Sequence, residues 1–242
     1  MKVFLNEITG MDDAFVTMYM SKRTWTRELE ETLRNDWTTY LLFKDMQDID
    51  EGARKAIENT KARINSFCKW AWQHTTMLDY VTISVTVEGM HRAGQDDWDA
   101  HACRYNNRII RSSTRLADFS DGEMSDFYKG KIIPTDVALK ILGIEIPENI
   151  YVEGQTYVKA VNGYIREDLK NNRDVKRGLY MQSIPSNFIF KCNMAQWAHV
   201  YKMRNENSGA NPEVKELAES IQDQIEAEMP WFNREFIMKV KV

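Results

Sequence analysis

The chain has 242 residues, of which 43% are hydrophobic and 28% charged, with a formal net charge of −4. This length is enough to bury a core and fits one globular domain over residues 1–242. The negative charge argues against sequence-independent binding to duplex nucleic acid, because such binding relies on neutralising phosphates.

The three cysteines are scattered and form no C-x-x-C pair, which argues against a disulfide framework or a structural zinc site. Only four histidines occur, so no metal site is expected. The N-terminus has no apolar signal core, and no apolar run is long enough to span a membrane. We therefore expect a cytoplasmic protein without a membrane partner.

The first half of the chain predicts alternating strands and helices. Residues 2–8 alternate as a strand does, and Gly10 is expected to close it. Asp12 or Asp13 can cap a helix that begins near Ala14. Further helices are expected over 27–43, 51–72 and 96–111, and the β-branched stretch 80–87 is the clearest strand, ended by Gly89.

The second half is less regular. Residues 118–164 hold two prolines and several glycines, and we expect an insertion or lid there with a short helix at 135–142. Helices are predicted over 174–179 and 193–203, with a turn at Pro185 between them. Asn211 and Pro212 are typical of a helix start. The helix that follows has an apolar stripe, formed by Val214, Leu217, Ile221, Ile225 and Met229.

Three clusters carry groups suited to ligand binding. Residues 104–115 hold four arginines, three hydroxyl residues and two asparagines, which are the groups that bind phosphate. This pattern leaves a phosphate site and a solvated basic helix end equally open. Residues 193–204 place Asn193, Gln196, His199 and Lys202 on one helix face, and that face can also simply meet water. The third cluster, residues 73–76, lies between a helix and a strand, where His74 fits a structural role as well.

The order and spacing of these clusters resemble the flavin-dependent thymidylate synthases. The segment Gln73–Asp79 resembles a motif that this family carries before a strand. Ala102-Cys103-Arg104, followed by Ser113-Thr114-Arg115, resembles its arginine-rich motif, and 193–204 resembles a third motif. Pro230-Trp231 after the last long helix also matches. The resemblance covers most of the chain, and 118–164 is its weakest part.

This resemblance implies a mixed α/β (α+β) fold and a homotetramer with active sites where subunits meet. The abundant Trp and Met residues indicate either thick core packing, which we expect for most of them, or extensive subunit contact. The implied reaction transfers a one-carbon unit from methylenetetrahydrofolate to C5 of dUMP or a related pyrimidine deoxynucleotide, with FAD as hydride carrier and NADPH as reductant.

The resemblance also assigns roles to individual residues. Ser113, Thr114 and Arg115, with Arg111 beside them, would bind the nucleotide phosphate. Arg204 would bind the pyrimidine and act in catalysis by stabilising charge that develops on the ring. The flavin would be held by a further set: His74, Thr75, Arg104, Asn193 and His199.

The sequence departs from the family motifs at several positions that carry charge. Ala102, Cys103 and Ala195 stand where the motifs have basic or imidazole groups, and Arg111 stands where they have an acidic residue. These changes leave two alternatives open. One is an enzyme with a different base or product, such as a pyrimidine nucleotide hydroxymethylase, and the other is a nucleotide-binding homologue without catalysis.

Overall fold

The computed structural model describes residues 1–102, 108–113, 123–205, 209 and 211–241, without the side chains of 100–102 and 108. The chain divides into two compact units. The larger unit comprises Phe4–Val85, Ala102–Arg108 and Phe190–Val242, and the smaller unit comprises Met1–Val3, Thr86–His101 and Ile109–Ile189. Each unit has its own candidate residues, whereas the strands of the main sheet contribute residues to both units.

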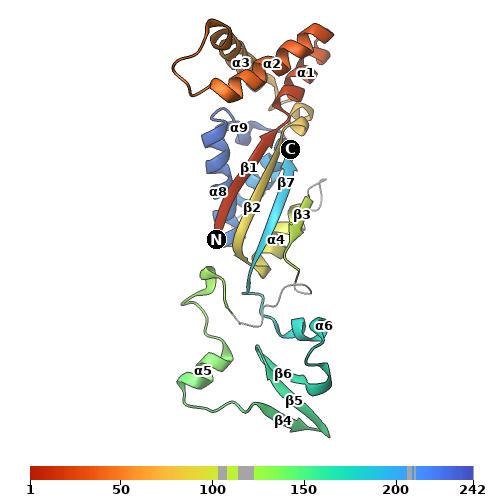
Figure 1. Ribbon diagram of the computed structural model, residues 1–242, viewed down its shortest axis with the longest axis vertical. Coiled ribbons are helices and arrows are strands. Elements are labelled where there is room, and N and C mark those ends of the chain that lie inside the picture. Colours follow the sequence, from red (N-terminus) through yellow and green to blue (C-terminus); the bar gives the residue numbers. More distant parts are fainter. Residues whose placement is uncertain (103–107, 114–122, 206–208, 210, 242) are drawn as a thin grey trace. The chain divides into compact units, whose positions relative to one another are not determined.

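The main sheet has four strands in the order β1-β2-β7-β3 (Figure 1). Their bounds are Lys2–Thr9 for β1, Thr82–His91 for β2, Pro185–Asn193 for β7 and Arg108–Arg111 for β3. Strand β7 alternates strictly, with Phe188, Phe190 and Cys192 buried and the residues between them exposed. This period of two is what a strand with one covered face requires.

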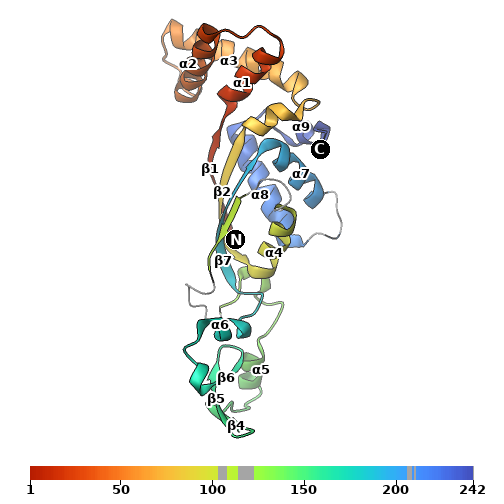
Figure 2. The same cartoon turned by 90° about the vertical axis from the view of Figure 1, so that its right-hand side faces the viewer.

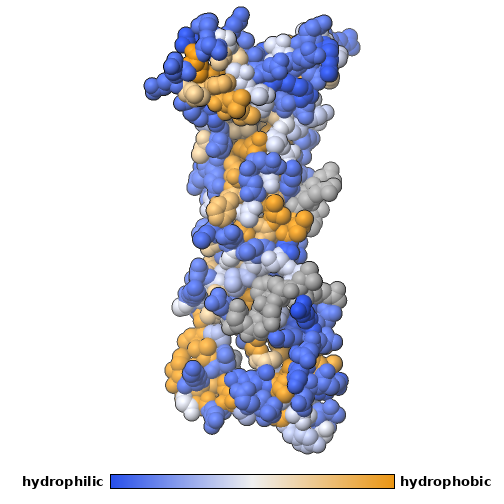
Figure 3. Space-filling view, viewed as in Figure 1, coloured by the Kyte–Doolittle hydropathy of each residue, from blue (hydrophilic) through white to orange (hydrophobic). Residues whose placement is uncertain are grey.

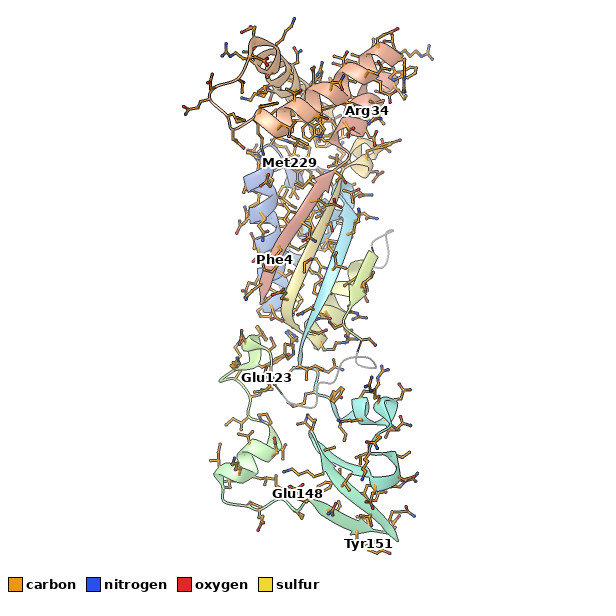
Figure 4. The ribbon with its side chains drawn as sticks, in the orientation of Figure 1. Phe4, Arg34, Glu123, Glu148, Tyr151 and Met229 are labelled. Carbon is orange, nitrogen blue, oxygen red and sulfur yellow. The ribbon has the colours of Figure 1, made fainter. Side chains whose placement is uncertain are left out.

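Three helices open the larger unit: α1 (Met11–Ser21), α2 (Arg27–Phe43) and α3 (Glu51–Trp70). Phe15 of α1 meets Trp37 and Phe67 edge to face, at centroid distances of 5.8 and 6.3 Å. Arg34, labelled in Figure 4, joins α2 to α1 through Asp12 and Asp13 at 2.6 and 2.8 Å. Aromatic packing and this ion-pair network together hold the three helices against one another.

Helices α7 (Met194–Asn205), α8 (Pro212–Glu228) and α9 (Arg234–Lys239) complete the larger unit. Helix α8 lies against one face of the strands (Figure 2), and its Gln224 accepts a hydrogen bond of 2.7 Å from the backbone of Leu5. Asn211 caps α8 as predicted, accepting from the Glu213 backbone N–H at 3.0 Å. All five residues of the predicted apolar stripe are buried, which confirms that it faces the core.

The smaller unit contains α4 (Arg92–Ala102), α5 (Thr135–Ile141) and a three-stranded antiparallel sheet. The strands of this sheet are β4 (Asn149–Val152), β5 (Gln155–Ala160) and β6 (Gly163–Arg166). Short helical turns η2 (Asp126–Tyr128), η3 (Glu167–Leu169), α6 (Arg173–Lys176) and η4 (Arg177–Leu179) complete it. The predicted helix at 135–142 is therefore confirmed, whereas the strands β4–β6 lie where irregular structure was expected.

Several predicted boundaries are wrong. The first helix begins at Met11, and its N-cap is Gly10 with a φ of 84° rather than an aspartate. A Cβ at Gly10 would lie 2.0 Å from the Tyr80 carbonyl oxygen, so this contact requires glycine. Strand β2 continues through Gly89 to His91. In place of the helix expected over 96–111, helix α4 covers Arg92–Ala102. Residues 108–111, the last four of the expected helix, form strand β3.

Candidate functional site

The candidate residues belong to two groups, one in each unit. His74, Thr75, Asn193, His199 and Arg204 lie in the larger unit, whereas Arg111 and Ser113 lie in the smaller one. Arg104, Thr114 and Arg115 lie outside the described residues. The sequence patterns thus fall on residues of both units.

In the larger unit, η1 (Thr75–Tyr80) and α7 bring four of the candidates together. The two elements pack against each other. The backbone N–H of Met194, the first residue of α7, donates to the carbonyl of Val81 at 2.8 Å. Since Val81 directly follows η1, this bond brings the start of α7 to the end of η1. Exposed His74 and half-buried Thr75 therefore belong to the same local structure as Asn193.

Asn193 has a structural task at this junction. Its side-chain oxygen accepts a hydrogen bond of 2.8 Å from the backbone N–H of Gln196, which satisfies a free donor in the first turn of α7. Burial raises the pKa of Asp79, and a hydrogen bond from Asn193 opposes this rise. Asn193 thus links the carboxylate of η1 to the beginning of α7.

The polar face predicted for α7 is present. Asn193, Gln196, His199 and Lys202 are partly exposed, while Trp197 and Ala198 between them are buried. The Lys202 ammonium donates to the carbonyl of Val240 at 2.6 Å. Lys202 therefore anchors the C-terminal segment, and the half-buried His199 imidazole is the candidate group that this face offers to a ligand.

Arg204 is only 3% exposed. Burying a guanidinium is costly unless the surroundings supply acceptors or a counter-charge, so this arginine is not an ordinary surface cation. The helix that carries it is held firmly to α8. Trp197 Nε1 donates to Gln222 at 2.8 Å, and the Tyr201 hydroxyl donates to Glu219 at 2.9 Å. Arg204 therefore occupies a fixed, buried position near the end of α7.

In the smaller unit, β3 leads into Ser112 and Ser113. The backbone N–H of Ser112 donates to the Asn187 carbonyl on β7 at 2.9 Å, and its hydroxyl donates to the same oxygen at 3.3 Å. Arg111 forms ion pairs with Asp96 and Asp99 of α4, the latter at 3.0 Å. These contacts fix the backbone leading to the half-buried Ser113 and occupy the Arg111 guanidinium with two carboxylates.

Arg92, which the sequence analysis did not single out, lies beside this segment. It is the first residue of α4, and its guanidinium donates to the carbonyl oxygen of Ser112 at 3.3 Å. Its signal in the sequence was its place immediately after a buried strand, where a side chain often lies at the edge of a sheet. Because the helix was predicted to begin at residue 96, Arg92 was assigned to the loop before it and was not considered as a site residue.

A cavity of about 330 Å³ opens in the larger unit at β1, α2 and α8. It is lined by both apolar and polar side chains, among them Trp37, Tyr40, Trp231 and Met229, the last labelled in Figure 4. None of the candidate residues lines it. Among the described residues, no cluster of three or more His, Cys, Asp or Glu side chains is arranged to hold a metal ion. No helix in the described parts of the chain is both long and apolar enough to cross a membrane.

The sequence profile of the family described as thymidylate synthase complementing protein matches residues 14–231. This match spans most of the chain, including both groups of candidate residues. The chain belongs to this family, the flavin-dependent thymidylate synthases.

Solved structures agree with the family in fold. Thymidylate synthase X from Helicobacter pylori, solved with FAD and dUMP, is 12% identical, with a TM-score of 0.55 and coverage of 98% of this chain and 99% of that one. The UMP/dUMP methylase PolB from Streptomyces cacaoi, solved with 5-Br dUMP, is also 12% identical, with a TM-score of 0.55 and coverage of 100% and 97%. None of the curated protein sequences matches this chain. The chain thus has the mixed α+β fold of a flavin-dependent thymidylate synthase.

Proposed function

We propose that this protein transfers a one-carbon unit from methylenetetrahydrofolate to C5 of dUMP or a related pyrimidine deoxynucleotide. One observation carries the proposal. Two similar structures, each aligned over nearly all of both chains, are described with a deoxyuridylate in place, and the second is described as a UMP/dUMP methylase. A common fold with one ligand class in both supports a pyrimidine nucleotide as the substrate here.

Arg204 is the residue proposed to act on the base. C5 can attack a one-carbon electrophile only while the pyrimidine ring is electron-rich, and a fixed guanidinium near the ring stabilises the negative charge of that enolate-like state. The burial of Arg204 supports this role, because charge stabilisation is stronger where water is excluded. Its helix is anchored at Trp197 and Tyr201, so little reorganisation is needed during the reaction.

The phosphate is proposed to bind at Ser113, Thr114 and Arg115. The described part of this segment is well positioned, since Ser112 is bonded to β7 and Arg111 to α4. Arg111 belongs to the proposed site as well, although Asp96 and Asp99 already balance its charge. Arg and hydroxyl donors together suit a monoester dianion.

FAD is the proposed cofactor, and the side chains proposed to hold it can form hydrogen bonds with a flavin. His74 and Thr75 at η1, with Asn193 and His199 at α7, offer hydroxyl, amide and imidazole groups to a polar ring edge. Arg104, which also belongs to the proposed FAD-binding set, would supply positive charge to bind the pyrophosphate of FAD. When bound, the flavin supplies hydride, with NADPH as the proposed reductant. Asn193 and Asp79 would keep η1 and α7 in place, and the imidazoles of His74 and His199 would orient the ligand.

The proposed assembly is a homotetramer in which subunits complete one another's sites. The two groups of candidate residues, one in each unit, are compatible with sites built from more than one chain. Light scattering at micromolar protein concentration is expected to give four times the mass of the 28.4 kDa chain. A monomer at that concentration would remove the shared-site part of the proposal.

The reaction is tested by incubating the purified protein with FAD, NADPH, methylenetetrahydrofolate and dUMP, and by identifying the nucleotide product by mass spectrometry. We expect a mass gain of one methyl group in place of a ring hydrogen. Arg204→Lys is expected to lower kcat far more than it changes the affinity for dUMP, because the interaction strengthens in the transition state. An unchanged kcat in Arg204→Lys would contradict the assigned role.

A nucleotide-binding homologue without catalysis is the alternative that one observation favours. Ala195, where the family motif has an arginine, is 8% exposed on α7, so a cationic donor is missing from a covered position. In that case, dUMP would bind, and no product would form under any reductant. A hydroxymethylated product would instead indicate the altered-outcome enzyme on the same scaffold.

A further inference from the structure

Arg92 is a guanidinium whose charge is not balanced by its neighbours. It is half-buried, and its backbone N–H is already bonded to the Ile184 carbonyl at 3.1 Å. Its guanidinium gives one hydrogen bond, to the Ser112 carbonyl at 3.3 Å. A guanidinium has five N–H donors, so most of its capacity is left over. Within the described part of the chain, no carboxylate forms an ion pair with Arg92.

The nearby carboxylates are engaged elsewhere. Asp96 and Asp99, on the helix that Arg92 begins, both pair with Arg111. The pKa of Arg92 is lowered mainly by burial and then by the positive charge of Arg111, with Asp96 acting in the opposite direction and Arg177 adding to the repulsion. Of these three guanidiniums, Arg111 pairs with Asp96 and Asp99, and Arg177 lies 3.7 Å from the Asp174 carboxylate. Among the described residues, Arg92 is the one of the three without an ion pair.

Such an arrangement costs free energy in the unliganded protein. Partial burial removes water from a cation, and like charges nearby add repulsion, so an anion bound there would relieve both costs. A phosphate monoester suits the site particularly well, because a guanidinium binds two of its oxygens at once.

The position of Arg92 beside the proposed phosphate site indicates that the anion is the phosphate of the nucleotide. The Arg92 guanidinium touches the carbonyl of Ser112, and the next residue is Ser113, whose hydroxyl is proposed to bind the substrate phosphate. Arg111, by contrast, already has its charge balanced by Asp96 and Asp99. Arg92 can bind it without losing any ion pair.

We propose that Arg92 binds the phosphate of the nucleotide substrate together with Ser113, an assignment that rests on the proposed function. Arg111 then contributes chiefly by holding the segment that leads to Ser113 against α4. The charge of the substrate, rather than its base, is what Arg92 recognises.

The test measures binding of dUMP and of deoxyuridine, which lacks the phosphate, by calorimetry on the full-length protein. In Arg92→Ala, the affinity for dUMP is expected to fall about 10- to 100-fold, the range for loss of a charge-assisted bond. The affinity for deoxyuridine should stay within about twofold. Arg92→Lys keeps the charge without the fork and should recover part of the loss.

Arg166→Ala is the matched control, because Arg166 is a half-buried arginine of the same unit that, unlike Arg92, pairs with a carboxylate, that of Asp168 at 2.5 Å. It should leave both affinities unchanged. If Arg92→Ala does not fold, Arg92→Lys and Arg92→Gln give the same comparison. An unchanged ratio of dUMP to deoxyuridine affinity in folded Arg92 variants overturns the proposal while leaving the proposed function intact.

The same binding measurements also distinguish a failure of the proposed pyrimidine function from a failure of the Arg92 assignment. If wild type binds neither dUMP nor deoxyuridine, but binds another nucleoside monophosphate such as AMP with an affinity that falls in Arg92→Ala, the pyrimidine function fails. The assignment of Arg92 to a phosphate then stands. Binding of none of these nucleotides overturns both.

Discussion

The larger unit and one segment of the smaller unit differ sharply in how many of their side chains are buried. We call residues 126–182 the lobe. In the larger unit, whole side chains such as Phe15, Phe67, Trp197 and Phe232 are fully covered. In the lobe, every residue is described, and only Ile165 is buried. The same chain thus contains a close-packed core and a sheet with almost none.

The lobe instead exposes apolar side chains. Figure 3 shows apolar surface gathered over α5, where Ile141 and Leu142 are each 71% exposed. Tyr151 on β4, labelled in Figure 4, is 74% exposed. A small antiparallel sheet without a covered face has little free energy to hold it together. Hydrogen-bonded strands alone therefore do not indicate a stable region, and the lobe is predicted to be the least stable part of the protein.

The largest expected effect is a difference in amide hydrogen exchange between the two regions. Amides paired between β5 and β6, such as those near Tyr157 and Arg166, should exchange at least about a thousandfold faster than those in the middle of α8. Mass spectrometry of peptides from both regions measures this. Equal protection would show that the lobe is covered by contacts beyond its own chain, and repeating the experiment at lower protein concentration tests that explanation.

Next in size is the effect of truncating an aromatic side chain in the core. Trp197→Ala removes a fully buried ring and its hydrogen bond to Gln222, and should destabilise the protein by about 3–5 kcal/mol in urea unfolding. Tyr151→Ala in the lobe is the matched control and should change the main transition by less than about 0.5 kcal/mol. Similar costs for the two variants would remove the contrast in packing.

Thiol reactivity compares the same regions chemically. Burial raises the pKa of Cys68 to about 12 and also raises that of Cys192, so almost no thiolate is present at pH 8. In a Cys103→Ser background, both should react with a disulfide reagent at least about a hundredfold more slowly than Cys introduced by Val152→Cys in the lobe. Fast reaction of either native thiol would contradict the burial of the larger unit.

The smallest effect concerns Asp79 beside the candidate site. Because partial burial of the carboxyl raises its pKa in the folded state, the protonated form favours folding, and the ionised form at neutral pH disfavours it. Asp79→Asn should therefore raise the melting temperature slightly at pH 7. The difference from wild type should vanish as the pH falls and the wild-type carboxyl takes up its proton. A lower melting temperature for Asp79→Asn at pH 7 would mean that the bond to Asn193 outweighs the cost of burial.

The sequence by itself determined the elements whose signals are local. The Asn211-Pro212 start and the apolar stripe of α8 were read correctly, because a cap and a period of 3.6 residues are set by near neighbours. The order of the three motifs also identified the family, and with it the fold. The polar face of α7 followed from the same helical spacing.

Tertiary contacts decided the rest. Residues 108–111 suit a helix as well as a strand. They form strand β3 because they pair with β7, and the contact between Ser112 and Asn187 joins residues that are 75 positions apart in the sequence. The Gly10 cap depends on the approach of the Tyr80 carbonyl, which no local pattern encodes. The sequence singled out Arg204 through the family resemblance and gave no reason to single out Arg92. Arg204 is buried, and Arg111 forms ion pairs with the acidic residues near Arg92. Both situations arise only when segments distant in the sequence meet, because the energetic cost of a charge depends on all the groups around it.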